Sequence, residues 1–132
     1  MSQENVGIVR SLYASWERQG SFSVSGLLHP AMVWINPSDA IETGTHVGAN
    51  AFDDAMKSIT DSFEEVHFDI DEYLDAGDDV VVFAIMRARG RDSGATVEDK
   101  QGHVWTLDNG KAVRLRWFHD RDQALEAAGL LG

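Results

Sequence analysis

The 132-residue chain contains no cysteine and only two prolines. Without cysteine it can form no disulfide, no thiolate nucleophile and no cysteine-based metal site. It also has no apolar run long enough to cross a membrane and no basic-then-apolar start typical of a secretory signal. From these absences we expect a cytoplasmic protein without a membrane segment.

Positive charge is scarce as well. The sequence has 11 Lys and Arg residues against 22 Asp and Glu residues, which gives a net charge of −11. A nucleic-acid-binding protein needs a basic face to displace counterions, so this composition excludes that class. The sequence shows no metalloprotease, EF-hand, P-loop or dinucleotide-binding motif, and we therefore expect neither a metal nor a cofactor.

The hydrophobic fraction of 43% is enough for one core, and we expect a single domain over residues 1–132. Helical spacing of apolar residues predicts helices over residues 4–19, 23–28, 49–63 and 122–130. Gly20 is expected to end the first of them. A strand is expected over residues 31–36, followed by a polar loop over residues 37–48.

Alternating apolar and polar residues then predict four antiparallel strands, over residues 66–74, 80–91, 95–107 and 111–119. The order of elements predicts an α+β domain with helices on one face of a curved sheet. Within the second of these strands both alternating sets are apolar. The even-numbered set can face the helices, so the odd-numbered set (Val81, Phe83 and Ile85) needs another cover. A second copy of the chain is the simplest one, which predicts a homodimer through the outer sheet face.

Two turns compete in the last hairpin. Asn109-Gly110 favours a two-residue loop, whereas a three-residue loop over residues 108–110 with a bulge at Gly110 better separates the bulky apolar residues from the arginines. Because a one-residue slip would bury two arginines, we expect the three-residue loop. The inner face then carries His103, Trp105, Leu107, Val113, Leu115, Trp117 and His119. The directly opposed pairs are His103 with Leu115, Gln101 with Trp117, and Asp99 with His119.

With these residues the chain resembles the SnoaL-like group of the nuclear transport factor 2-like, ketosteroid-isomerase-like superfamily. The resemblance implies a cone, in which helices wrap a curved sheet around a deep apolar pocket, and homodimers through the outer sheet face. The segments that carry it are residues 8–13 leading to Gly20, residues 28–30 with Val33-Trp34, residues 44–48 and residues 103–120.

The resemblance also assigns roles by position. Ketosteroid isomerases place a carboxylate base before a proline at the end of the first strand, where this sequence has Asn36, which cannot take a proton. Tyr13 matches their first-helix tyrosine, and His103 stands where their oxyanion-hole acid lies. Trp117 replaces the acid/base aspartate of the polyketide cyclases and one aspartate of the limonene-type epoxide hydrolases. Asp99 matches the other aspartate of those hydrolases.

Four residues are therefore catalytic candidates. Tyr13 and His103 are expected either to donate hydrogen bonds to a carbonyl or to belong to the core. His119 and Asp99 are expected to be either a base with its orienting carboxylate or a structural ion pair. His29 and His46 are expected to be exposed loop residues. The predicted ligand-binding residues are Trp16, Trp34, Asn36, Phe52, Met56, Phe63, Met86, Gln101, Trp105, Leu115 and Trp117.

Three functions remain open. The first is a cofactor-independent isomerase, cyclase or hydrolase acting on an apolar carbonyl-bearing or polycyclic compound. The second is a non-catalytic protein that binds a lipophilic small molecule, which a lining of methionine and aromatic residues suits. The third is a dimeric interaction module. The fold does not decide among them.

Overall fold

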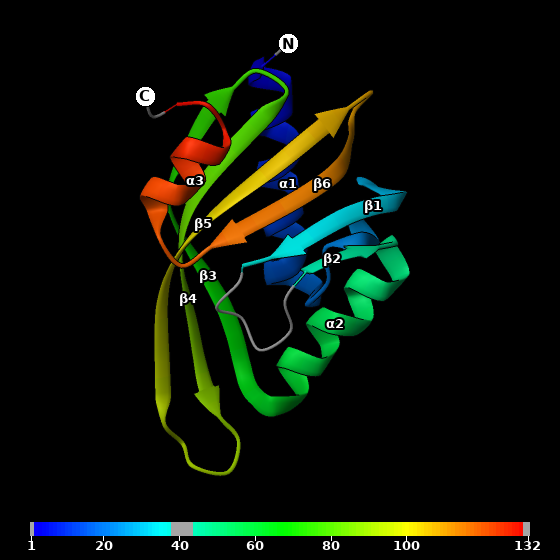
Figure 1. The fold of residues 1–132 in the computed structure, drawn as a ribbon. Helices are drawn as coiled ribbons and strands as arrows, with labels where there is room; N and C mark the ends of the chain where they lie inside the picture. Colours follow the sequence, from blue (N-terminus) through cyan, green and yellow to red (C-terminus); the bar gives the residue numbers. More distant parts are fainter. Residues whose placement is uncertain (1, 38–43, 131–132) are drawn as a thin grey trace.

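The computed structural model describes residues 2–37 and 44–130, which form three α-helices and a six-stranded mixed sheet (Figure 1). The sheet is curled but not closed, and the predicted α+β class is confirmed. The elements in chain order are α1 (Ser2–Gln19), a 3-10 turn (Ser23–Ser25), β1 (Leu28–Asn36), β2 (Gly44–Val47), α2 (Ala49–Ser62), β3 (Phe63–Ala76), β4 (Asp79–Gly90), β5 (Thr96–Asp108), β6 (Lys111–Phe118) and α3 (Arg121–Ala127).

The strand order is β2-β1-β6-β5-β4-β3, and β1 runs parallel to β6 while the other neighbours are antiparallel. Two predictions in the first half of the chain are wrong. The helix expected over residues 23–28 is only a 3-10 turn, because Leu28 already begins β1. The loop expected over residues 37–48 contains β2, which pairs with β1; residues 38–43 of that loop lie outside the described residues.

The helices cover both faces of the sheet. α1 and α2 pack on one face, which we call the inner face, and α3 packs on the other, the outer face (Figure 1). The main core lies on the inner face and includes Val80 and Val82 of β4, whereas Val81 lies in a smaller outer cluster with Val104 and Ala124. The alternation predicted for β4 is confirmed. Its outer set, however, is partly covered by α3 of the same chain, so a partner subunit is not the only available cover.

Close approach of α3 to the sheet depends on Gly102 of β5. A Cβ atom placed on Gly102 would lie 2.5 Å from the Cβ atom of Ala124, closer than two carbon atoms can pack. Asp120 caps α3 by accepting a hydrogen bond from the Asp122 backbone N–H at 2.8 Å. The guanidinium of Arg121 lies 5.0 Å from the ring centroid of Phe83, which adds a cation–π contact to the docking.

The last hairpin differs from the expected one. Asp108 pairs with Lys111 across a two-residue loop, in which Asn109 and Gly110 have positive φ values of 50° and 77°. The irregularity lies at Val113 instead, because Thr106 pairs with Arg114 whereas Leu107 pairs with Ala112. The three-residue loop was therefore wrong, and so were the opposed pairs: His103 faces Trp117, and Trp105 faces Leu115.

The predicted division of residues between the two faces nevertheless holds for β5 from His103 onward and for β6 from Leu115 onward. The extra residue at Val113 shifts the alternation of side chains between the two faces by one position, as an extra loop residue would. The tryptophans therefore face α1 and α2, while Arg114 and Arg116 face outward. Within residues 2–37 and 44–130, no helix is long and apolar enough to cross a bilayer.

Candidate functional site on the inner face of the sheet

A continuous series of side-chain hydrogen bonds runs along the inner face; we call it the inner-face network. Trp105 Nε1 donates to the Tyr13 hydroxyl at 2.9 Å, and this hydroxyl lies 2.5 Å from His103 Nδ1. His103 Nε2 lies 2.8 Å from Gln101 Oε1, and Gln101 Nε2 donates to Asp99 Oδ2 at 2.8 Å. The network ends where His119 Nδ1 lies 2.9 Å from the same Asp99 oxygen. Its members are Trp105, Tyr13, His103, Gln101, Asp99 and His119.

Burial determines the protonation states within this network. It lowers the pKa of His103 to about 4, so the imidazole is neutral near pH 7. Burial also raises the pKa of Tyr13, which therefore keeps its proton. Tyr13 then donates to His103 Nδ1, and His103 Nε2–H donates to Gln101. All the donors consequently point the same way, from the buried indole of Trp105 to the carboxylate of Asp99.

The two ends of the network differ in exposure. Trp105, Tyr13 and His103 are 1%, 4% and 6% exposed, whereas the Asp99 and His119 side chains are 29% and 37% exposed. The contact expected between Asp99 and His119 is present, although β5 and β6 bring the two residues together diagonally rather than directly opposite. The network thus connects the centre of the core to a carboxylate–imidazole pair that solvent can reach.

Aromatic side chains surround the same face. The indole Nε1 of Trp117 donates to Asn36 Oδ1 at 2.7 Å, and the Trp34 ring lies 5.5 Å from that of Phe52. Trp117 also contacts His119, with ring centroids 5.0 Å apart. The residues that combine partial exposure with a place near this end of the sheet are Asn36, Met86, Trp117, Asp99 and His119.

A family model described as SnoaL-like domain matches residues 9–115, most of the chain. The chain belongs to the SnoaL-like family. No match was found among curated proteins.

Solved structures agree with this family. A nuclear transport factor 2-like protein from Burkholderia thailandensis is 26% identical over 91% of this SnoaL-like chain and 95% of its own, with a TM-score of 0.77. A protein described as a SnoaL-like polyketide cyclase from Jannaschia sp. is 19% identical over 99% and 94%, with a TM-score of 0.77. TerC, co-crystallised with polyporic acid, is 24% identical over 96% and 98%, with a TM-score of 0.74. The last two comparisons show a shared fold.

The remaining predicted ligand residues of the SnoaL-like domain divide into two groups. Some are deeply buried: Trp16 donates from its indole to the Val66 carbonyl at 3.0 Å and stacks on Phe22 at a centroid distance of 5.0 Å. This places Trp16 among core rings. Buried members of the predicted set are Trp16, Trp34, Phe52, Gln101, Trp105 and Leu115, and half-buried members that pack against the same core are Met56, Phe63 and Met86.

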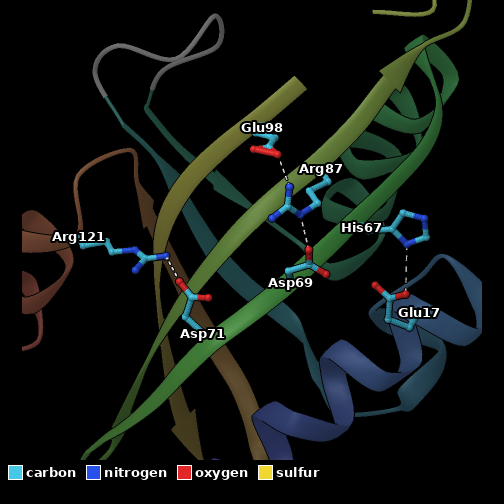
Figure 2. Close-up of polar contacts among 7 residues, drawn as sticks. All are labelled: Glu17, His67, Asp69, Asp71, Arg87, Glu98 and Arg121. Atoms are coloured by element: carbon cyan, nitrogen blue, oxygen red, sulfur yellow. Dashed lines mark hydrogen bonds and ion pairs between the residues drawn. The ribbon is translucent and has the colours of Figure 1, made fainter. Parts of the chain in front are cut away.

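One hollow among the described residues lies elsewhere, on the outer face. It has a volume of about 270 Å³ and is lined mainly by charged residues of β3, β4 and β5, including Glu65, His67, Arg87, Arg89 and Glu98. Figure 2 shows the ion pairs around it: Arg87 between Asp69 and Glu98, and His67 against Glu17 at 3.3 Å. None of these residues is among those predicted for the site. Its charges are paired with one another, as on a solvated sheet surface.

Sequence reasoning missed one inner-face residue. His46 was expected in an exposed loop, but it lies in β2 opposite Trp34, and its ring stacks on that indole at a centroid distance of 5.1 Å. β2 has four residues, too few for an alternating pattern to stand out. His29, also expected in a loop, lies in β1 and is exposed as predicted. Within the described part of the chain, no group of three or more His, Asp or Glu residues is placed to hold a metal ion.

Proposed function

We propose that this SnoaL-like domain binds an apolar, carbonyl-bearing or polycyclic small molecule on the inner face of its sheet. We further propose that it catalyses a cofactor-independent isomerisation, cyclisation or hydrolysis of that molecule. The observation that carries the proposal is the inner-face network, which ends in a contacting Asp99–His119 pair at the partly exposed edge of an aromatic-rich face. Such a pair beside an apolar surface suits proton transfer on a lipophilic substrate.

In the proposed reaction His119 is the acid/base group. When its Nδ1–H donates to Asp99, its Nε2 carries the lone pair and accepts a proton from substrate carbon or from water. The Asp99 carboxylate stabilises the imidazolium, which then returns the same proton to another atom of the substrate or to a leaving oxygen. Gln101 holds the carboxylate in place through its own N–H group.

Tyr13 and His103 have a different part in this proposal. Each was predicted to be either a donor to a substrate carbonyl or a core residue, but the Tyr13 proton is directed to His103, and His103 Nε2 is bonded to Gln101. A substrate contact would require one of these buried bonds to open. We therefore assign both residues to orienting Gln101, through which they act on Asp99.

A second function, non-catalytic binding of a lipophilic molecule, is favoured by Asn36. Related isomerases have their base there, whereas Asn36 cannot take a proton and is bonded to the Trp117 indole. This function needs the apolar face but no proton transfer.

The two functions are separated by a binding screen followed by a turnover assay. Thermal-shift measurements with polyporic acid, steroids and terpenoid ketones identify a ligand, and the compounds that bind are assayed for conversion. We expect His119→Gln and Asp99→Asn to lower turnover by roughly 10²–10⁴-fold while binding persists. His67→Gln, on the outer face, is the matched control. Binding without turnover in the unaltered protein would favour the second function, and no binding would contradict both.

We also propose a homodimer through the outer sheet face. Phe83 and Ile85 lie on this face of β4 and remain half-exposed beside α3. Light scattering should give twice the chain mass for the unaltered protein and a monomer for Ile85→Glu. Ile59→Glu, at a 38% exposed position on α2, which packs on the inner face, is the control and should leave the dimer intact. A monomeric unaltered protein would overturn this proposal.

A further inference from the structure

His46 lies on the helix-facing side of the sheet. In the β1–β2 ladder it pairs with Trp34, and paired residues of neighbouring strands point to the same face. Trp34 is 6% exposed, and its ring lies 5.1 Å from the His46 imidazole and 5.5 Å from Phe52 of α2. The imidazole is therefore part of the aromatic surface on which the proposed ligand would rest.

The Nε2 atom of His46 is buried and has no hydrogen-bond partner among residues 2–37 and 44–130. This distinguishes it from the inner-face network, in which the nitrogen atoms of His103 and the amide of Gln101 are bonded. Two other buried nitrogens without a partner in that part of the chain, Arg116 Nε and Arg121 Nε, belong to guanidinium groups that make hydrogen bonds through at least one other nitrogen. Of these three residues, His46 is the one on the inner face, where its ring stacks on Trp34.

A buried polar atom without a partner destabilises the folded protein, and an exception of this kind calls for an explanation. The position of the ring supplies one. A polar atom of a ligand that enters beside Trp34 and Phe52 would satisfy Nε2. Because Nε2 and both rings are buried, neighbouring side chains must move apart to admit the ligand, while the β1–β2 ladder stays paired.

We propose that His46 Nε2 forms a hydrogen bond to an oxygen atom of the bound small molecule. This inference rests on the proposed function and adds a binding residue and a ligand class to it. A single imidazole nitrogen beside the Trp34 indole suits a flat, neutral, apolar ring system with one keto or hydroxyl oxygen. Nε2–H donates to a keto oxygen, and the other tautomer accepts from a hydroxyl group. His46 thus selects ligands by an oxygen at the Trp34 end, whereas Asp99 and His119 are assigned to the chemistry.

Three probes of the same shape test this assignment: 9-fluorenone, 9-fluorenol and fluorene, which carry a keto oxygen, a hydroxyl group and no oxygen. Dissociation constants are measured by tryptophan fluorescence, and the His46 imidazole nitrogens are followed by long-range ¹H–¹⁵N NMR. In the unaltered protein we expect both oxygenated probes to bind at least about tenfold more tightly than fluorene, the size of one added hydrogen bond. We expect the Nε2 resonance to move with those two probes only.

His46→Phe keeps a ring against Trp34 and removes the nitrogen, so the variant should bind all three probes with similar affinity. His46→Gln is a second variant in case the larger ring disturbs folding, which circular dichroism monitors, and it should retain part of the preference through its amide. His67→Phe on the outer face is the control and should keep the full preference.

Equal binding of the three probes to the unaltered protein, or a preference that survives in His46→Phe, would overturn the role of His46 and leave the proposed function standing. Binding of none of the three would count against the proposed function and the role of His46 together.

Discussion

The two faces of the sheet place histidines in opposite environments. On the inner face, burial lowers the pKa of His103 to about 4, and its partners Tyr13 and Gln101 are neutral. On the outer face, the hydrogen bond that His67 donates to the Glu17 carboxylate raises the pKa of His67, whose side chain is 49% exposed. The buried polar groups at the centre of the inner face are thus neutral and interdependent, whereas those on the outer face are charged, paired and screened by water.

The largest expected effect concerns the inner histidine. The unfolded chain takes up a proton at this residue near pH 6.5, but the folded protein does so only near pH 4, so stability must fall as the pH decreases between those values. Since each pKa unit is worth about 1.4 kcal/mol, the loss attributable to His103 approaches about 3 kcal/mol. Urea unfolding between pH 8 and pH 4.5 measures it.

The control is His103→Gln, which retains a polar group but cannot titrate. Carboxylates titrate in both proteins, so the difference between their unfolding free energies isolates His103. That difference should shrink steadily below pH 6.5. If NMR showed that His103 titrates near pH 6.5 in the folded protein, this would contradict the conclusion that burial keeps its imidazole neutral.

The next effect concerns the place where α3 covers the outer face. Gly102→Ala should lower the free energy of unfolding by about 1–3 kcal/mol, because the new Cβ atom would lie 2.5 Å from that of Ala124 and α3 must shift. Ala124→Gly alone should cost about 1 kcal/mol through lower helix propensity. Faster hydrogen exchange of α3 amides would report the displacement.

The double variant Gly102→Ala with Ala124→Gly sharpens this test. It removes the clash from the helix side, so its loss of stability should be smaller than the sum of the two single losses. Additive losses would show that the close approach of α3 is not what restricts position 102.

The division of residues between the two faces was predictable from sequence because burial decides it. Placing tryptophans inward and Arg114 and Arg116 outward favours one parity, and the protein has that parity. The local backbone geometry that produces this parity was not predictable, because a two-residue loop at Asn109-Gly110 with a bulge at Val113 gives the same faces as a three-residue loop. The predicted cross-strand partners were consequently displaced by two residues.

One contact among the candidate site residues was predictable from sequence, but the network that links them was not. Asp99 and His119 were expected to meet, and they do, at 2.9 Å. Gln101 was expected to line the site, but its bridging of His103 and Asp99 depends on side-chain torsions that no sequence pattern encodes. His46 was missed because the four residues of β2 are too short for alternation to distinguish a strand from a loop.

The smallest expected effect belongs to the outer histidine. Because the folded pKa of His67 is raised, its contribution to stability is complete below pH 6.5 and is lost as the pH rises through the folded pKa. Exposed pairs of this kind contribute less than about 1 kcal/mol. Glu17→Gln should return the pKa of His67 toward 6.5 in an NMR titration. Glu98→Gln, which alters a pair of Arg87 on the same face, should change it little.

An unchanged pKa of His67 in Glu17→Gln would show that the contact with Glu17 of α1 is not what raises this pKa. The effects of pH on stability through His103 and through His67 have opposite signs. Rising pH increases stability through His103 between pH 4 and pH 6.5, and it decreases stability through His67 above pH 6.5. The two windows meet at pH 6.5 and extend in opposite directions from it, so the sign of the pH dependence distinguishes the contribution of His103 from that of His67.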